Sequence, residues 1–141
     1  MTARRTAPAF ALLAALAIAR AQPLSAQATA SAASAGWQAT PASVLKHALR
    51  AAAAAQARYR AEHGTYAADV RQLALRSDPG VVIELLGAGT RGWRGKATHS
   101  SQPGRSCVVF VGAQDGAESP RTDGDREMAG EDGVPLCDRM R

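Results

Sequence analysis

Two cysteines are the residues of this sequence that are best placed to form a covalent link. Cys107 opens the apolar stretch 107–111 (CVVFV), and Cys137 ends the last apolar stretch of the chain. With only these two cysteines, a four-thiolate zinc site and a C-x-x-C redox pair are both excluded. In an oxidising compartment a bridge would close a loop of about 30 residues and stabilise the fold by roughly 3–4 kcal/mol on the chain-entropy model. We therefore expect a structural disulfide between them.

Three carboxylates at alternate positions are the candidate metal ligands. Asp123, Asp125 and Glu127 lie in the acidic loop 113–133, which is rich in glycine and poor in large apolar residues. Calcium binds six to eight oxygen atoms from carboxylates and carbonyls, although the twelve-residue EF-hand spacing is absent here. Two interpretations stay open: an ordinary solvated loop, or a calcium-stabilised extracellular adhesion or ligand-binding module that uses residues 115–132.

The histidines and glycines offer no recognisable catalytic arrangement. His47, His63 and His99 form no i, i+4 metal pair, and no G-x-S-x-G turn is present to carry a nucleophilic serine. Residues 87–92 match G-x-G-x-x-G, but a dinucleotide site needs a helix directly afterwards, whereas the sequence favours a strand. We expect a protein that is not an enzyme and that has no cofactor other than the candidate calcium.

The net charge of +5 changes once the first segment is set apart. Residues 1–28 have a basic start, an apolar stretch of 11 residues and a small-x-small site at 26–28, which predicts a secretory signal peptide. Without it the chain has 14 basic and 12 acidic residues, too balanced for a typical nucleic-acid-binding protein. We expect export to the periplasm or the extracellular space, no stable membrane span after cleavage, and a flexible leader over residues 29–40.

The elements that position these residues follow from local signals. Thr40 is a good N-cap, residues 41–62 are rich in alanine with an apolar stripe, and Gly64 suits the end of a helix. Thr65 is expected to cap a further short helical turn. Alternating or apolar stretches predict strands over 81–86, 93–99 and 107–111, with a short edge strand within 133–137.

The predicted fold is therefore α+β. One long N-terminal helix packs on a small antiparallel sheet of three to four strands, and one disulfide holds the C-terminal loop. The domain is expected to span residues 41–141.

The order of these elements resembles the globular head of type IV pilins and type II secretion pseudopilins. Tyr59, Gly64 and Tyr66 match a Y-x-x-x-x-G-x-Y ending of the helix, and Trp93 and His99 match G-[YW]-x-x-x-A-x-H in a strand. The cysteine pair corresponds to the pair that bounds the C-terminal loop of that family. Unlike a pilin, the chain has no glycine before Gly36 and no acidic residue before Glu62, so the usual prepilin N-terminal helix is missing.

The resemblance implies a structural or binding module rather than an enzyme. It implies partners in the envelope, a pilus or a type II secretion apparatus. The charge distribution is compatible with docking: residues 41–105 have a net charge of +6 and residues 106–141 a net charge of −4, a polarity that suits a complementary protein surface.

Overall fold

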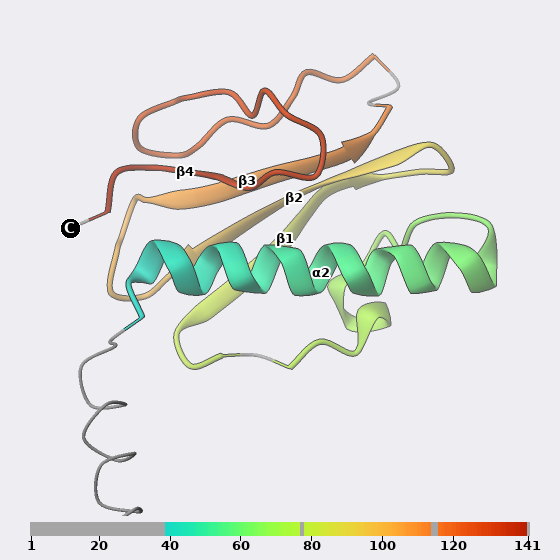
Figure 1. Cartoon of the computed structure of the whole chain (residues 1–141), viewed down its shortest axis with the longest axis horizontal. Helices are drawn as coiled ribbons and strands as arrows, with labels where there is room; N and C mark the ends of the chain where they lie inside the picture. The colour runs from blue at the N-terminus through green and yellow to red at the C-terminus, as the bar shows by residue number, and fades with distance from the viewer. Residues whose placement is uncertain (1–38, 77, 114–115, 141) are drawn as a thin grey trace, which may run out of the picture. The chain divides into compact units, whose positions relative to one another are not determined.

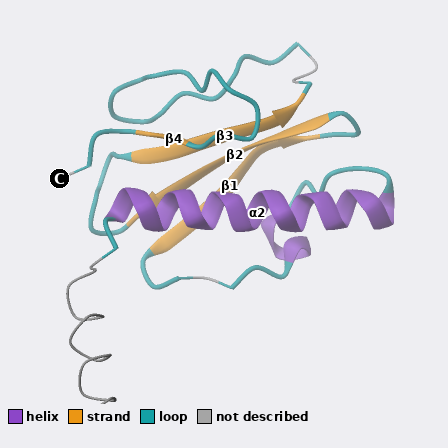
Figure 2. Ribbon diagram, viewed as in Figure 1, coloured by secondary structure: helices purple, strands orange, loops and turns teal. Residues whose placement is uncertain are grey.

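The computed structural model describes residues 39–76, 78–113 and 116–140. The predicted signal peptide, the leader up to residue 38 and the acidic residue Asp115 lie outside the described residues. The described chain has an α+β fold with one α-helix, a four-stranded antiparallel sheet and one disulfide (Figures 1 and 2). That fold class agrees with the prediction.

Helix α2 spans Pro41–His63 and has the ends that the sequence predicted. The Thr40 hydroxyl accepts the N–H of Ser43 at 3.2 Å, and Pro41 occupies the first turn, where a missing N–H costs nothing. Gly64 adopts a left-handed conformation, with φ of 76°, and donates its N–H to the Arg60 carbonyl at 2.8 Å. A residue without a side chain is favoured at that position. Within the described residues no helix combines the length and the apolar character that a membrane crossing requires.

The expected second helical turn is present, but its cap is a different residue. It is a 3-10 helix, η1, over Val70–Leu73. Asp69, not Thr65, is the N-cap, because its carboxylate accepts the N–H of Arg71 at 2.9 Å. Gln72 completes a capping box by accepting the N–H of Asp69 at 3.2 Å.

The sheet is a meander in the order β1-β2-β3-β4. Its strands are β1 (Val81–Ala88), β2 (Gly92–His99), β3 (Ser106–Gly112) and β4 (Leu136–Cys137), each antiparallel to its neighbours. The G-x-G-x-x-G match covers the last two residues of β1, the turn and the first residue of β2, so a strand and not a helix follows the turn, as predicted. The edge strand β4 is only two residues long and starts directly after Pro135, which cannot donate a ladder hydrogen bond.

One face of the sheet packs on α2 and forms the core. Leu45, Leu49 and Ala52 of the helix cluster with alternate residues of β2 and β3, which are Trp93, Ala97, Cys107 and Val109. Alternation along the strands turns the intervening residues to the far face. Val108 belongs to that far face, yet it is fully buried, so another segment must cover it.

The covering segment is the C-terminal one, whose described residues are 116–135. Figure 1 shows it folded back beside β3 and β4 rather than extending into solvent. Thr122 is completely buried, and Ala129 is 2% exposed. The described part of 113–133 is a loop with mostly exposed residues, and Thr122 and Ala129 are the points at which it is anchored in the protein.

Candidate functional site

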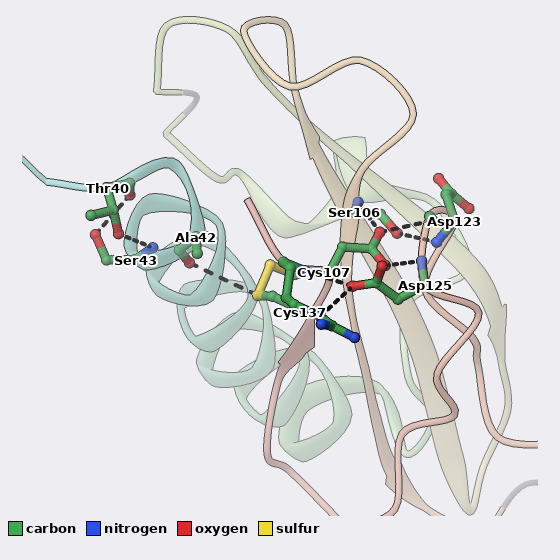
Figure 3. The surroundings of a disulfide bond; sticks show 11 residues. Thr40, Ala42, Ser43, Ser106, Cys107, Asp123, Asp125 and Cys137 are labelled. Carbon is green, nitrogen blue, oxygen red and sulfur yellow. Dashed lines mark hydrogen bonds and ion pairs between the residues drawn. A yellow bond between two sulfur atoms is a disulfide. The ribbon is translucent and has the colours of Figure 1, made fainter. Parts of the chain in front are cut away.

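The predicted disulfide is present and joins the two strands that frame the C-terminal segment. Cys107 of β3 and Cys137 of β4 are opposite each other in the ladder and 30 residues apart in sequence. Both lie on the side of the sheet that faces α2 (Figure 3), and Cys137 Sγ is 3.9 Å from the carbonyl oxygen of Ala42. The bridge therefore fixes the base of the segment beside the start of the helix.

A buried carboxylate holds the same segment from the other side of the ladder. Asp138 is 2% exposed. One of its oxygens, Oδ2, accepts the backbone N–H groups of Ser106 at 2.8 Å and Gly124 at 2.9 Å, and Oδ1 accepts that of Asp125 at 2.6 Å. Burial raises the pKa of Asp138, but these backbone donors and the Thr122 hydroxyl outweigh burial and lower the pKa overall.

A small hairpin inside the segment is built around Thr122. Its N–H donates to the Glu127 carbonyl at 2.9 Å, and its hydroxyl accepts the N–H of Glu127 at 3.1 Å. A bridge between Arg121 and Met128 extends the hairpin. The acidic turn 123–127 is thus the tip of a hairpin. The Asp138 carboxylate holds this tip by accepting hydrogen bonds from its backbone.

The three candidate calcium ligands are placed against basic groups or solvent. The Asp125 carboxylate lies 2.7 Å from the Arg105 guanidinium and accepts the N–H of Arg139 at 2.8 Å. The hydrogen bond from the Arg139 N–H has the largest effect and that from Arg105 the next, and together they lower the pKa of Asp125. Asp123 lies 3.5 Å from Lys96 Nζ, and the Glu127 side chain is exposed.

No metal cluster is formed by these three residues. Within ranges 39–76, 78–113 and 116–140, no group of three or more His, Cys, Asp or Glu side chains is arranged to hold a metal ion. The calcium site remains a prediction from the sequence. The contacts of Asp123 and Asp125 indicate a structural role for these carboxylates.

Lys96 connects the acidic turn to the far face of the sheet. Its ammonium lies 3.3 Å from Glu84 on β1 and 3.5 Å from Asp123. Burial lowers the pKa of Lys96, but the two carboxylates outweigh burial and raise it overall. Lys96 therefore bridges β1, β2 and the C-terminal segment as a charged group.

The first group of family-motif residues gathers at the end of α2. Tyr59 stacks on the His63 ring, with centroids 4.0 Å apart, and its hydroxyl accepts a hydrogen bond from Gln72 at 3.2 Å. Tyr66 is 8% exposed and receives the Arg60 guanidinium on its ring face, 5.0 Å from the centroid. With Gly64 between them, these residues reverse the chain and return it to the sheet, where the Tyr66 N–H donates to the Gly89 carbonyl at 3.0 Å.

The second group, Trp93 and His99, is split between two places. Trp93 is 1% exposed and belongs to the core. His99 Nδ1 accepts the N–H of Ser101 at 3.1 Å and lies 2.7 Å from its hydroxyl, so the ring caps the turn after β2. His99 and His47 also line a shallow hollow of about 510 Å³ together with Asp78. The motif residues are therefore structural, and they form no single site.

Sequence reasoning missed two buried polar residues that organise the molecule. Asp138 was only one acidic residue among eight in the last third of the chain. Gln56 is fully buried on α2; its amide donates to the Ala67 carbonyl at 2.9 Å and accepts the Ala67 N–H at 2.8 Å. The sequence did contain a sign of this contact, because Gln56 lies on the apolar stripe of the helix. An amide buried there needs a hydrogen-bond partner.

Comparison with known proteins gives no relative from which a function could be taken, so the functional argument starts from the structure. The chain matches no protein-family model and no curated protein sequence.

Proposed function

We propose that this chain is an exported, non-enzymatic structural or binding module with a pilin-like head, acting beside a pilus or a type II secretion apparatus. The observation that carries the proposal is the disulfide Cys107–Cys137, which bounds a C-terminal segment packed on a helix-and-sheet body. Such a bridge is typical of proteins that fold in an oxidising compartment.

The rigidity of the C-terminal segment supports a role in recognition. The disulfide, the Asp138 carboxylate and the Thr122 hairpin hold its backbone, while Glu118, Glu127, Glu131 and Asp132 remain exposed. A rigid surface with exposed carboxylates loses little conformational entropy when it binds a basic partner surface. The expected mode of action is therefore docking through charge, with an affinity that falls as salt is added.

Localisation and partner capture test this proposal together. The full chain, tagged at its C-terminus, would be produced in a bacterium that has both a type IV pilus and a type II secretion apparatus. We expect the protein in the periplasmic or extracellular fraction with its two thiols oxidised, and cross-linked to pilus or secretion components. A chain that stays in the cytoplasm with free thiols would overturn export. Recovery in the envelope without any such component would overturn the assignment of partners.

A further inference from the structure

Strand β1 is an edge strand of the sheet that the structure describes, with β2 as its one neighbouring strand, and its other edge is unpaired. The N–H of Ser100 donates to the Gly80 carbonyl at 2.8 Å, one residue before β1 begins. Since the Cα register continues as Val82 opposite Thr98 and Glu84 opposite Lys96, these pairs exchange the ladder hydrogen bonds with β2. The backbone groups of Ile83 and Leu85 must then point away from β2.

Among the described residues, the outward N–H and C=O groups of Ile83 and Leu85 have no hydrogen-bond partner. Near the start of the strand, the Val81 N–H donates to the Asp78 carbonyl at 3.1 Å, which leaves the Val81 carbonyl as an acceptor. At the C-terminal end of the edge, the pairing register with β2 shifts between Leu85 and Gly87, and the regular edge ends there. The open edge is therefore the five-residue segment 81–85.

Although η1 contacts β1, the sequence of the edge itself lacks the residues that usually protect an exposed strand. Segment 81–85 (VVIEL) contains no proline and no lysine, and its one charge, Glu84, pairs with Lys96 within the same chain. Val82 is 63% exposed, more than any other large hydrophobic residue in the described part of the chain. Natural edges of this length and apolar character are normally blocked or used for pairing.

We propose that β1 pairs with β1 of a second copy of this chain, antiparallel and two-fold symmetric about Ile83. In that register Ile83 is opposite its symmetry mate, and Val81 is opposite Leu85 of the other copy. Four backbone hydrogen bonds form: two between the Ile83 residues and one from each Leu85 N–H to the Val81 carbonyl of the other copy. The two sheets join into one.

Charge and geometry select this register over its neighbours. A two-fold axis at Glu84 would place two carboxylates directly opposite each other, which is destabilising. An axis at Val82 would pair Glu84 with Gly80, whose left-handed backbone, with φ of 80°, lies outside the strand. The Ile83 register instead places Val82 opposite Glu84 of the other copy, so the aliphatic part of the glutamate covers the exposed valine.

Introducing a negative or a positive charge at Val82 tests both the dimer and its register. Val82→Glu and Val82→Lys alter the same exposed side chain and leave the core untouched. In the proposed register each variant residue faces Glu84 of the other copy, so the new charge pair occurs twice per dimer. We expect Val82→Glu to weaken dimerisation about twofold to thirtyfold, and Val82→Lys to strengthen it by a similar factor, in the range of two cross-strand charge pairs.

Sedimentation equilibrium of the purified chain over a range of concentrations measures the dissociation constants, and thermal melts confirm that both variants fold. A wild-type chain that stays monomeric at every concentration would overturn the proposal and leave a strand of another protein as the occupant to seek. A dimer whose dissociation constant responds to neither variant, or in the same direction to both, would also overturn it.

Discussion

Ser106 and Asp138 hold each other by two reciprocal hydrogen bonds across the end of the sheet. The Ser106 N–H donates to the Asp138 carboxylate at 2.8 Å, and the Asp138 N–H donates to the Ser106 carbonyl at 3.0 Å. The Ser106 hydroxyl accepts the N–H of Asp123 at 2.8 Å, so the same pair also fixes the acidic turn. Together with the adjacent disulfide, this contact joins β3, the acidic turn and the end of the chain.

The substitution Asp138→Asn is expected to lower the free energy of unfolding by about 1.5–3 kcal/mol, the range for hydrogen bonds to a charged group. An amide offers one acceptor oxygen where the carboxylate offers two. The backbone N–H groups that now bond to one of the two carboxylate oxygens must therefore lose their acceptor. Urea denaturation of both proteins measures the difference. Glu131→Gln, an exposed acidic residue of the same segment, is the matched control and should change stability by no more than about 0.5 kcal/mol.

Acid is expected to destabilise the fold through the same carboxylates. The folded-state pKa values of Asp138 and Asp125 are lowered relative to an ordinary aspartate. Their contribution to stability is therefore complete above about pH 4, the ordinary aspartate value, and is lost as pH falls through the folded pKa. The stability gap between wild type and Asp138→Asn should shrink as pH is lowered from 5 towards about 3. A gap that is constant over this range would show that the ionised form of Asp138 is not what stabilises the site.

Most of the fold could be predicted because its signals are local. Thr40, Pro41 and Gly64 mark the helix ends through hydrogen bonds and backbone angles within four residues, and the strands follow their alternation. The cap of η1 was assigned to Thr65 instead of Asp69 because both residues are good caps, and only the path of the chain decides between them.

The arrangement of the C-terminal segment could not be predicted because its contacts are long-range. Asp138 and Ser106 are 32 residues apart, and nothing in the sequence distinguishes Asp138 from the exposed acidic residues. The high content of Asp, Glu and Gly indicated solvation, yet Thr122 and Ala129 are buried. A few small residues are enough to pack such a segment when a disulfide and a buried carboxylate hold its ends.

The disulfide is expected to contribute about 3–4 kcal/mol to stability, on the chain-entropy model for a loop of this length. The double substitution Cys107→Ala/Cys137→Ala should lower the melting temperature and the urea midpoint accordingly. Wild-type protein treated with a reductant should approach the same values, which separates loss of the bridge from the change of side chain. Labelling of denatured, unreduced protein should detect no free thiol; two labelled cysteines would contradict the bridge.

Gln56 is expected to be among the least replaceable residues of α2. Gln56→Leu has a similar volume but leaves the N–H and C=O of Ala67 without their partners, and each buried unpaired group costs about 1–3 kcal/mol. The loss should appear in urea denaturation and as faster hydrogen exchange of the Ala67 amide. Arg50→Gln, at an exposed position of the same helix, should leave both measurements near wild type. A stable Gln56→Leu protein with unchanged exchange would show that the amide contact is dispensable.

Calcium is expected to leave the melting temperature unchanged. Asp125 already contacts Arg105 and Arg139, and Asp123 contacts Lys96, so an ion would have to replace these contacts to obtain its oxygen ligands. Specific binding at a concentration of 100 times the dissociation constant would stabilise the fold by about 2.7 kcal/mol, a shift that a thermal melt detects easily. Melts in calcium, in magnesium and in EGTA should therefore coincide. A rise in calcium alone that Asp125→Asn abolishes would instead establish the calcium site and make the acidic turn a metal-dependent binding surface.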